Sequence, residues 1–214
     1  MALFEIEFYQ LSNGREPAKE FMAGLGVKMR AKMADIISLL QDNGYELREP
    51  YSKHLTDGIF ELRAKVGSDA TRVLYFFYVN RRIILTNGFA KKTQKTPVGE
   101  IEKAKRYRVD FLERRKMMGT KFNDFLAEQL KDPEFRKEYE ALQPEHAVIQ
   151  AMIDARKASG LTQKELSERT RIAQGDISKL ENGNANPSIR TLQRLALAMG
   201  MTVRVEFLPL TRGK

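Results

Sequence analysis

The sequence predicts an α+β fold, in which a small β-sheet domain with a helical hairpin precedes an all-helical domain that ends in a strand. Two observations carry this prediction. Apolar and polar residues alternate in several short runs of the first half, as they do in half-buried strands. Helical spacing dominates the second half until Met201, and the 214 residues suffice for two small domains that each bury a core.

The first domain is expected to have the element order β-α-α-β-β-β-α. Phe4, Ile6 and Phe8 alternate and predict the first strand. Residues 17–40 show helical apolar spacing, and the glycines at positions 24 and 26 divide them into an antiparallel helical hairpin. The later strands and the closing helix are expected at residues 59–64, 72–79, 82–86 and 97–116.

A change of composition at residues 117–119 marks the predicted boundary between the halves. Three helices are expected after it, at about residues 122–130, 133–142 and 144–159. The chain begins without a basic region before an apolar run, and no apolar run reaches about 18 residues, so we expect neither a signal peptide nor a membrane span. The absence of cysteine excludes disulfides and thiolate metal sites. It fits a reducing compartment, and we expect a cytoplasmic protein.

Charge is distributed unevenly along the chain. The formal net charge is +9, with basic excesses in residues 1–117 and 146–214 and an acidic excess in residues 118–145. Basic surfaces favour nucleic-acid partners. On charge alone, however, a solvated lysine-rich surface is the better interpretation, so the prediction of a nucleic-acid partner depends on the motifs.

Residues 162–183, TQKELSERTRIAQGDISKLENG, have the spacing of a helix-turn-helix that presents its second helix to the DNA major groove. Thr162 and Glu165 form a capping box that predicts the start of the first helix. The second helix is expected to bury Ile177 and Leu180 and to end at Gly183, which can adopt a left-handed conformation. The predicted contacts with phosphates and base edges are Gln163, Gln174, Asp176, Ser178, Lys179 and Asn182.

Residues 201–207 alternate as a strand for which the second half offers no partner. An unpaired strand edge is a liability, and pairing with the same strand of a second copy is the simplest solution. We therefore expect a homodimer through the helical domain, because two-fold symmetry suits the half-sites that helix-turn-helix proteins bind.

Basic residues recur at the ends of the predicted strands in the first half. Strand ends that meet on one side of a small sheet would gather these side chains into a cleft. Such a cleft binds phosphate and stabilises the charge that develops on a scissile phosphodiester. The alternative is a set of surface ion pairs that contribute little stability. The candidates are Lys53, His54, Arg63, Arg72, Lys91 and Lys92.

Three motifs, KHLTDGIFELR, RVLYFFYVNRRIILTNGFAKKTQKTP and EIEKAKRYRVDFL, resemble the RelE/ParE superfamily. The resemblance is specifically to HigB-like toxins related to phage Gp49 and covers nearly all of residues 1–116. It implies a metal-independent endoribonuclease that needs no cofactor and cleaves mRNA on the ribosome. In the implied mechanism, the 2′-hydroxyl of the substrate attacks the adjacent phosphate.

The resemblance also assigns roles to the basic candidates by their motif positions. His54 or Lys53 would serve as proton donor or base, and Glu61 stands where other members carry a lysine. The residues that would hold the phosphate or stabilise the transition state are Arg63, Arg72, Lys91 and Lys92.

Residues 148–200 resemble the XRE/Cro-type repressor helix-turn-helix through TQKELS, ISKLENG and NPSIRTLQRLA. Three positions depart from the family pattern. Arg171 replaces a turn glycine, and Ala173 replaces a capping serine or threonine, so both substitutions are expected to cost some stability. Gly175 removes a side chain from the reading face, so we expect few base contacts.

The order of the two halves resembles the HigB–HigA toxin–antitoxin pair joined in one chain. It implies a toxin domain at residues 1–116, an acidic neutralising segment at 117–145 that contacts the toxin through 119–145, and an antitoxin domain at 146–214. The toxin half would inhibit translation. The antitoxin half would restrain it, bind operator DNA and repress its own transcription. The implied partners are operator DNA, the ribosome with mRNA, and a second copy of the chain.

Two other functions fit the same sequence. The first is a transcriptional regulator whose toxin-fold domain is inactive and serves protein contacts. The second is a gyrase-directed toxin, because the ParE branch shares this fold without being a ribonuclease.

Overall fold

The structure is a computed structural model that describes residues 4–91, 95–114, 119–181, 183 and 185–206. The chain divides into two compact units, Met1–His146 and Ala147–Lys214. The first unit contains a β-sheet with helices on both faces, and the second is helical in its described part. The predicted α+β fold class is therefore confirmed. Residues 119–146 belong to the same compact unit as the sheet.

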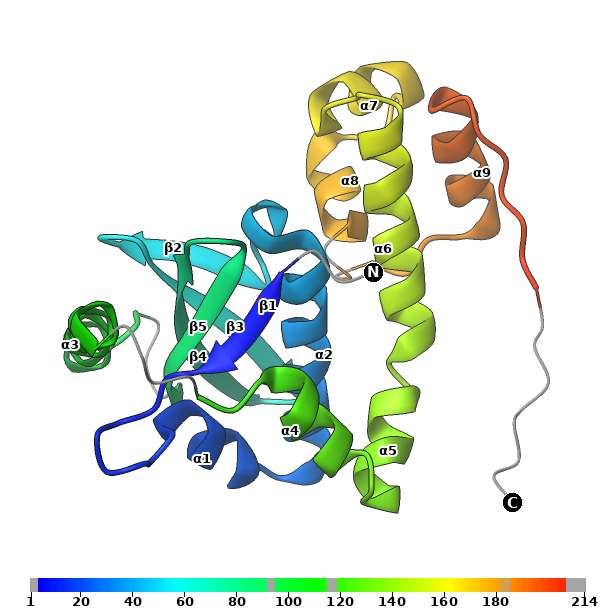
Figure 1. The fold of residues 1–214 in the computed structure, drawn as a ribbon. Coiled ribbons are helices and arrows are strands. Elements are labelled where there is room, and N and C mark those ends of the chain that lie inside the picture. Colours follow the sequence, from blue (N-terminus) through cyan, green and yellow to red (C-terminus); the bar gives the residue numbers. More distant parts are fainter. Residues whose placement is uncertain (1–3, 92–94, 115–118, 182, 184, 207–214) are drawn as a thin grey trace. The chain divides into compact units, whose positions relative to one another are not determined.

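The first unit is organised around a five-stranded mixed sheet with the order β1-β5-β4-β3-β2 (Figure 1). β1 pairs in parallel with β5, and the other neighbours pair antiparallel. The three strands expected after the helical hairpin are present as β3, β4 and β5. The strand bounds are β1 Glu5–Phe8, β2 Ser52–Thr56, β3 Ile59–Val66, β4 Asp69–Tyr78 and β5 Arg82–Ala90.

Strand β2 corrects the predicted element order, which omitted it. Its sequence, SKHLT, lacks an alternating apolar pattern because β2 is an edge strand on which Lys53 and His54 are exposed. A hairpin turn joins it to β3, and both Asp57 and Gly58 in that turn have positive φ. The dipeptide Asp-Gly is a strong hairpin signal and would have revealed the strand. Lys53 and His54 therefore lie within a strand rather than before one.

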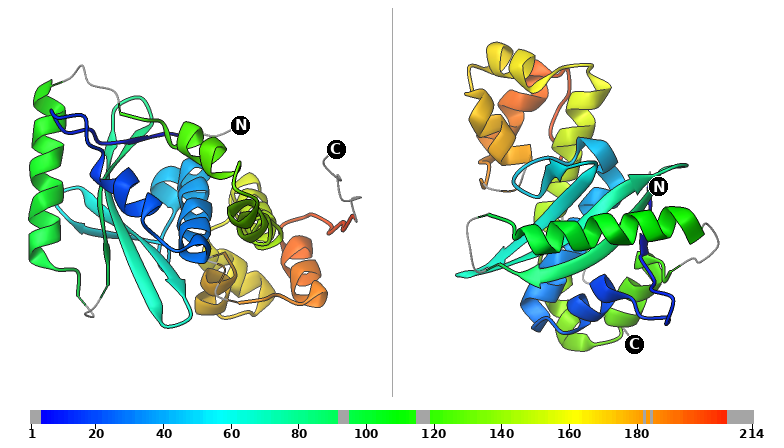
Figure 2. Two further views of the ribbon diagram at one scale, coloured as in Figure 1. Left: turned by 90° about the horizontal axis from the view of Figure 1, so that it is seen from below. Right: turned by 90° about the vertical axis from the view of Figure 1, so that its left-hand side faces the viewer.

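Helices cover both faces of this sheet (Figures 1 and 2). α1 and α2 form the predicted hairpin on one face, and Gly24 and Gly26 lie between them. α3 covers the opposite face, where Ala104 joins a core with Ile59 and Leu74. The bounds are α1 Pro17–Ala23, α2 Val27–Asn43, the 3-10 turn η1 Gly44–Glu46 and α3 Val98–Arg114.

Three further helices follow, and two of them pack on the body of the first unit. α5 packs against α2, and α4 packs against β1. Phe122 of α4 and Phe135 of α5 are fully buried, as the predicted apolar stripe requires. The third helix continues past His146 into the second unit. The bounds are α4 Phe122–Gln129, α5 Pro133–Glu140 and α6 Gln143–Ala158.

The second unit contains the predicted helix-turn-helix. Its helices are α7 Gln163–Thr170, α8 Gln174–Glu181 and α9 Ile189–Ala198. They enclose a core that includes Leu166, Ile177, Leu180 and Leu195. Residues 201–206 form no strand within the single chain, so their pairing with a second copy stays a prediction.

Candidate functional site

The basic candidates gather mainly on the sheet face that α3 covers. Arg63 of β3 and Arg72 of β4 lie directly opposite each other in antiparallel register, so both side chains project from one face. Glu61 precedes Arg63 by two residues and shares this face, as does Ile59, which joins the core cluster of Ala104 in α3. The two arginines therefore meet beside a carboxylate on the α3 side.

Glu61 is the central anion of this cluster and is only 2% exposed. Its Oε1 accepts a hydrogen bond from Arg63 Nε at 2.7 Å and lies 3.9 Å from Arg72 Nε. Its Oε2 accepts a hydrogen bond from Thr96 Oγ1, just before α3. Like charges directly opposite in a sheet repel, so Glu61 offsets the repulsion between the two arginines. Arg63 also donates through Nη1 to Glu49 Oε2 at 2.8 Å on the exposed side.

Among the described basic candidates, Arg72 and Lys91 have a lowered pKa. Burial lowers the pKa of Arg72 and outweighs the attraction of Glu61, and the charge of Arg63 lowers it further. Burial also lowers the pKa of Lys91, with further lowering by the charges of Arg72 and Arg63. Lys91 directly follows β5, and its backbone amide donates to the carbonyl of Ala70 at 2.8 Å, two positions before Arg72 in β4. The cluster is therefore a concentrated positive site that can hold a phosphate.

The other candidates are placed differently. Lys53 pairs with Glu61 across β2 and β3, but its Nζ lies 3.5 Å from Glu49 Oε1 in an exposed ion pair. His54 pairs with Phe60, whose side chain projects from the opposite face to that of Glu61, and the two rings lie 4.9 Å apart. The structure thus separates His54 from the arginine pair. Lys92 lies outside the described residues.

Residues 119–121 close the outer edge of the sheet at β1. The amide of Phe8 donates to the carbonyl of Thr120 at 3.0 Å, and Lys121 pairs with Glu7 in an isolated antiparallel bridge. Gly119 approaches so closely that an added Cβ would overlap the carbonyl oxygen of Phe8. The edge strand is therefore covered by backbone from the start of the acidic segment.

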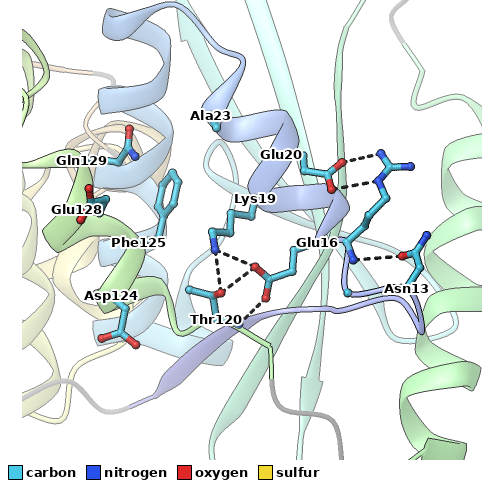
Figure 3. Close-up of a pocket in the computed structure, with 12 residues that line it drawn as sticks. Asn13, Glu16, Lys19, Glu20, Ala23, Thr120, Asp124, Phe125, Glu128 and Gln129 are labelled. Carbon is cyan, nitrogen blue, oxygen red and sulfur yellow. Dashed lines mark hydrogen bonds and ion pairs between the residues drawn. The ribbon is translucent and has the colours of Figure 1, made fainter.

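Glu16 fixes the same segment beside a pocket of about 630 Å³ between α1 and α4 (Figure 3). Its Oε1 accepts from the amide of Thr120 at 2.5 Å, and its Oε2 accepts from Thr120 Oγ1 at 2.7 Å and Lys19 Nζ at 2.9 Å. Burial raises the pKa of Glu16, but these hydrogen bonds outweigh burial and leave the pKa below its ordinary value. The sequence analysis missed Glu16, because Thr120 lies 104 positions away along the chain.

The acidic segment continues along the basic start of α2. Glu138 lies 4.0 Å from Lys28, and Asp132 lies 3.8 Å from Arg30. The guanidinium of Arg30 also stands 5.5 Å from the ring centre of the buried Phe135. Residues 119–146 therefore dock on β1 and α2 through both apolar burial and opposite charge.

His146 ends the first unit with a second buried contact that the sequence analysis missed. Its Nδ1 lies 2.8 Å from Asp35 Oδ1, and its Nε2 lies 3.7 Å from Asp42 Oδ2. Burial lowers the pKa of His146, but hydrogen bonds to Asp35 and Asp42, together with their charges, raise it to about 9. An imidazolium therefore ties the start of α6 to α2. A single histidine in a helical pattern gives no sign of such partners.

The helix-turn-helix has the predicted caps and one strained position. The capping box is present, with Thr162 and Glu165 each bonding the other's backbone amide. Arg171 ends α7 with a left-handed φ of 55°, where the family pattern has glycine. Gly183 has a φ of 64°, as expected for a residue that follows the second helix.

The predicted DNA contacts in α8 lie on its outer side. Gln174, Asp176 and Lys179 are exposed, and Ser178 is half-buried. Lys179 Nζ lies 2.8 Å from Asp176 Oδ1, so this lysine carries a partner of its own on the reading face. Their contact with DNA stays a prediction, and Asn182 lies outside the described residues.

Gln163 is held by a buried network within the second unit. Its Nε2 donates to Glu181 Oε2 at 2.8 Å, and Glu181 is 4% exposed. Arg156 donates to both oxygens of the same carboxylate, at 2.6 and 3.1 Å. The amide group of Gln163 is therefore occupied in the free protein.

The described residues include neither a candidate metal-binding cluster nor a helix that could span a membrane. Within them, no group of three or more His, Cys, Asp or Glu side chains is arranged to hold a metal ion. Their helices also include none with the length and apolar character needed to cross a membrane.

The chain is similar to known proteins in both halves. Residues 20–109 match the family described as phage-derived protein Gp49-like, and residues 152–205 match a helix-turn-helix family. An HTH-type transcriptional regulator of Haemophilus influenzae is 27% identical over 88 residues, which are 41% of this chain and 86% of the relative. The HTH-type transcriptional regulator y4dJ of Sinorhizobium fredii is 43% identical over 47 residues, which are 22% of this chain and 61% of the relative. The chain therefore joins a Gp49-like phage toxin domain to an XRE-type helix-turn-helix domain, an arrangement that fits a toxin–antitoxin fusion.

Proposed function

We propose that this protein is a toxin–antitoxin fusion whose first domain is a metal-independent endoribonuclease acting on mRNA at the ribosome. The observation that carries the proposal is the pair of directly opposed arginines, Arg63 and Arg72, with Lys91 directly after the neighbouring strand β5. Cations concentrated at a partly buried site favour a phosphodiester and the negative charge that grows during its cleavage. The match of residues 20–109 to the Gp49-like family supports it.

In the proposed reaction, the ribose 2′-hydroxyl attacks the adjacent phosphate and the 5′-oxygen leaves. Arg63 and Arg72 hold the phosphate oxygens through their guanidinium groups. Lys91 suits proton transfer better than His54 does, because burial and its cationic neighbours lower its pKa, whereas His54 lies on the other face. Lys92 keeps its expected supporting role.

We further propose that residues 119–145 are the neutralising segment. They dock on β1 and α2, whereas the arginine pair lies on the α3 side. We therefore expect this segment to inhibit mainly by covering the basic surface at Lys28 and Arg30 that would face the ribosome. Glu134 of this segment also lines a pocket of about 630 Å³ together with Lys28 and with Lys91, which is one of the predicted site residues.

The second unit is proposed to bind operator DNA through α8 and to repress transcription of its own operon. The expected form is a homodimer, with residues 201–207 pairing between copies. Exposed apolar side chains support an interface there, because Leu197 is 75% exposed and Val205 is 61% exposed.

A cell-free translation assay tests the proposed activity by mapping mRNA ends after addition of residues 1–116 or of the full chain. We expect cleavage by residues 1–116 and little by the full chain. Arg72→Ala should lower cleavage by about 100-fold or more, because it removes a transition-state contact. Arg106→Ala, which removes an exposed cation from α3, is the matched control. Equal cleavage by both chains would contradict the neutralising role.

A second candidate function has one observation in its favour. Glu61 already binds Arg63 and stands beside Arg72, which suits a toxin fold retained for protein contacts in a transcriptional regulator. In that case, expression of residues 1–116 would neither arrest growth nor cleave mRNA. Growth arrest without cleavage would instead favour a gyrase-directed toxin.

A further inference from the structure

We propose that Glu61 occupies the place of a substrate phosphate between Arg63 and Arg72, and that displacing it controls how tightly RNA binds there. The inference rests on the proposed function, because it takes the arginine pair as the RNA site. Glu61 is then a positioning residue and an internal competitor of the substrate.

The first support is the chemistry of the contacts. A carboxylate and a phosphate present similar oxygen edges to a guanidinium group. Glu61 Oε1 accepts from Arg63 Nε at 2.7 Å, while Oε2 is held by Thr96 Oγ1. Because Glu61 is 2% exposed, its carboxylate is a fixed part of the site and not a passing surface contact.

The second support is that Glu61 satisfies the two arginines unequally. Its distance of 3.9 Å from Arg72 Nε is too long for a hydrogen bond. The buried Arg72 Nε has no hydrogen-bond partner among the described residues, although Arg72 Nη1 donates to the carbonyl of Thr71 at 2.9 Å. A phosphate offers more acceptor oxygens than Glu61 does, so it can serve both guanidinium groups.

The third support is the excess of positive charge that remains with Glu61 in place. Burial lowers the pKa of Lys91 most, and the charges of Arg72 and Arg63 lower it further against the opposing effect of Glu61. The site therefore attracts an anion even while its internal carboxylate is bound.

The test compares two isosteric substitutions in the full chain, Glu61→Gln and Glu49→Gln. Glu49 is the matched control, since it also binds Arg63, at 2.8 Å, but from an exposed position without contact to Thr96. The probe is a short single-stranded RNA with 2′-O-methyl groups, which cannot be cleaved through its 2′-oxygens. Fluorescence anisotropy measures the affinity of each protein for this RNA at several salt concentrations. The variant Arg72→Gln shows how much of the RNA affinity depends on the arginine pair.

We expect Glu61→Gln to bind this RNA about tenfold more tightly than the natural chain, because a buried charge that opposes phosphate is gone. Its plot of log affinity against log salt should steepen by about 0.7, the value for one additional phosphate contact on a single strand. Glu49→Gln should stay within about twofold, as expected for an exposed pair. A merely structural role for Glu61 would not steepen the salt dependence.

Several outcomes would overturn the inference. Equal affinities of the Glu61 and Glu49 variants would do so, as would weaker binding by a folded Glu61→Gln protein. If Glu61→Gln does not fold, Glu61→Asp retracts the carboxylate while keeping its charge, and unchanged RNA affinity in that variant would refute competition. If Arg72→Gln weakens binding but Glu61→Gln does not strengthen it, only this inference fails. If Arg72→Gln has no effect, the proposed RNA site itself fails.

Discussion

Replacing Glu16 by glutamine should loosen the attachment of the acidic segment to the sheet. The natural carboxylate accepts three hydrogen bonds, two from Thr120 and one from the Lys19 ammonium. Glutamine keeps the size but has one acceptor oxygen and no charge, so the two donors to Glu16 Oε2, Thr120 Oγ1 and Lys19 Nζ, lose a charged acceptor. A charge-assisted hydrogen bond contributes about 1.5–3 kcal/mol, and we expect a loss of about 2–4 kcal/mol in local stability.

Glu20→Gln is the matched control. Glu20 lies in α1 as well and pairs with Arg15 at 2.6 Å, but the two side chains are 45% and 62% exposed. Exposed pairs contribute about 0.2–1 kcal/mol, so this change should be small.

Amide hydrogen exchange of the full chain is the suitable measurement, because the two units need not unfold together. The amides of Phe8 and Thr120 report directly on the attachment, since both donate hydrogen bonds across it. We expect both amides to exchange much faster in Glu16→Gln than in Glu20→Gln. Equal exchange in the two variants would refute the assignment of Glu16 as the residue that holds the segment.

The pH dependence of this attachment follows from the lowered pKa of Glu16. A carboxyl group whose folded pKa is depressed stabilises the folded state above its ordinary pKa of 4.5, and that stability is lost as pH falls below it. Protection of the Thr120 amide should therefore decrease in acid in the natural chain. In Glu16→Gln it should depend less on pH.

Three other changes test other parts of the molecule. His146 has a pKa raised from 6.5 to about 9, so its stabilisation of up to about 3 kcal/mol is complete below pH 6.5 and lost as pH rises toward 9. The free energy of unfolding in urea should therefore fall over this pH range in the control variant His54→Gln and not in His146→Gln. Arg171→Gly should stabilise the second unit by about 0.5–1 kcal/mol and raise its melting temperature, because glycine adopts the left-handed conformation without strain. A lower melting temperature would contradict that reasoning. The double substitution Gln174→Ala and Lys179→Ala should weaken binding to a palindromic operator, and unchanged affinity and sequence preference would show that the reading face is assigned wrongly.

Local sequence patterns predicted those features of the fold that depend only on neighbouring residues. The glycines between α1 and α2, the capping box of Thr162 and Glu165, and the left-handed Gly183 all act within a few residues of their position. Apolar periodicity likewise gave the buried faces of α5 and α8. Apolar periodicity missed strand β2, because an exposed edge strand has no apolar alternation; the local signal that indicates this strand is the Asp57-Gly58 turn after it.

The contacts that organise the candidate site are long-range, and the sequence could not predict them. Motif positions identified Arg63 and Arg72, but only the pairing of β3 with β4 places them opposite each other. Only the register of β2 against β3 shows that His54 lies on the opposite face of the sheet from these two arginines. The partners of His146 lie in another helix, more than 100 positions away.

The covering of β1 by residues 119–121 has a consequence for the toxin domain once it is separated from its acidic segment. Without those residues, β1 would present an unpaired edge, and the sheet would lose the aromatic cover that Phe125 gives Phe8 at a ring distance of 5.4 Å. An open edge beside an uncovered apolar patch invites pairing between copies. The released domain would therefore tend to associate with itself, and its lifetime as a dissolved monomer would fall as its concentration rises.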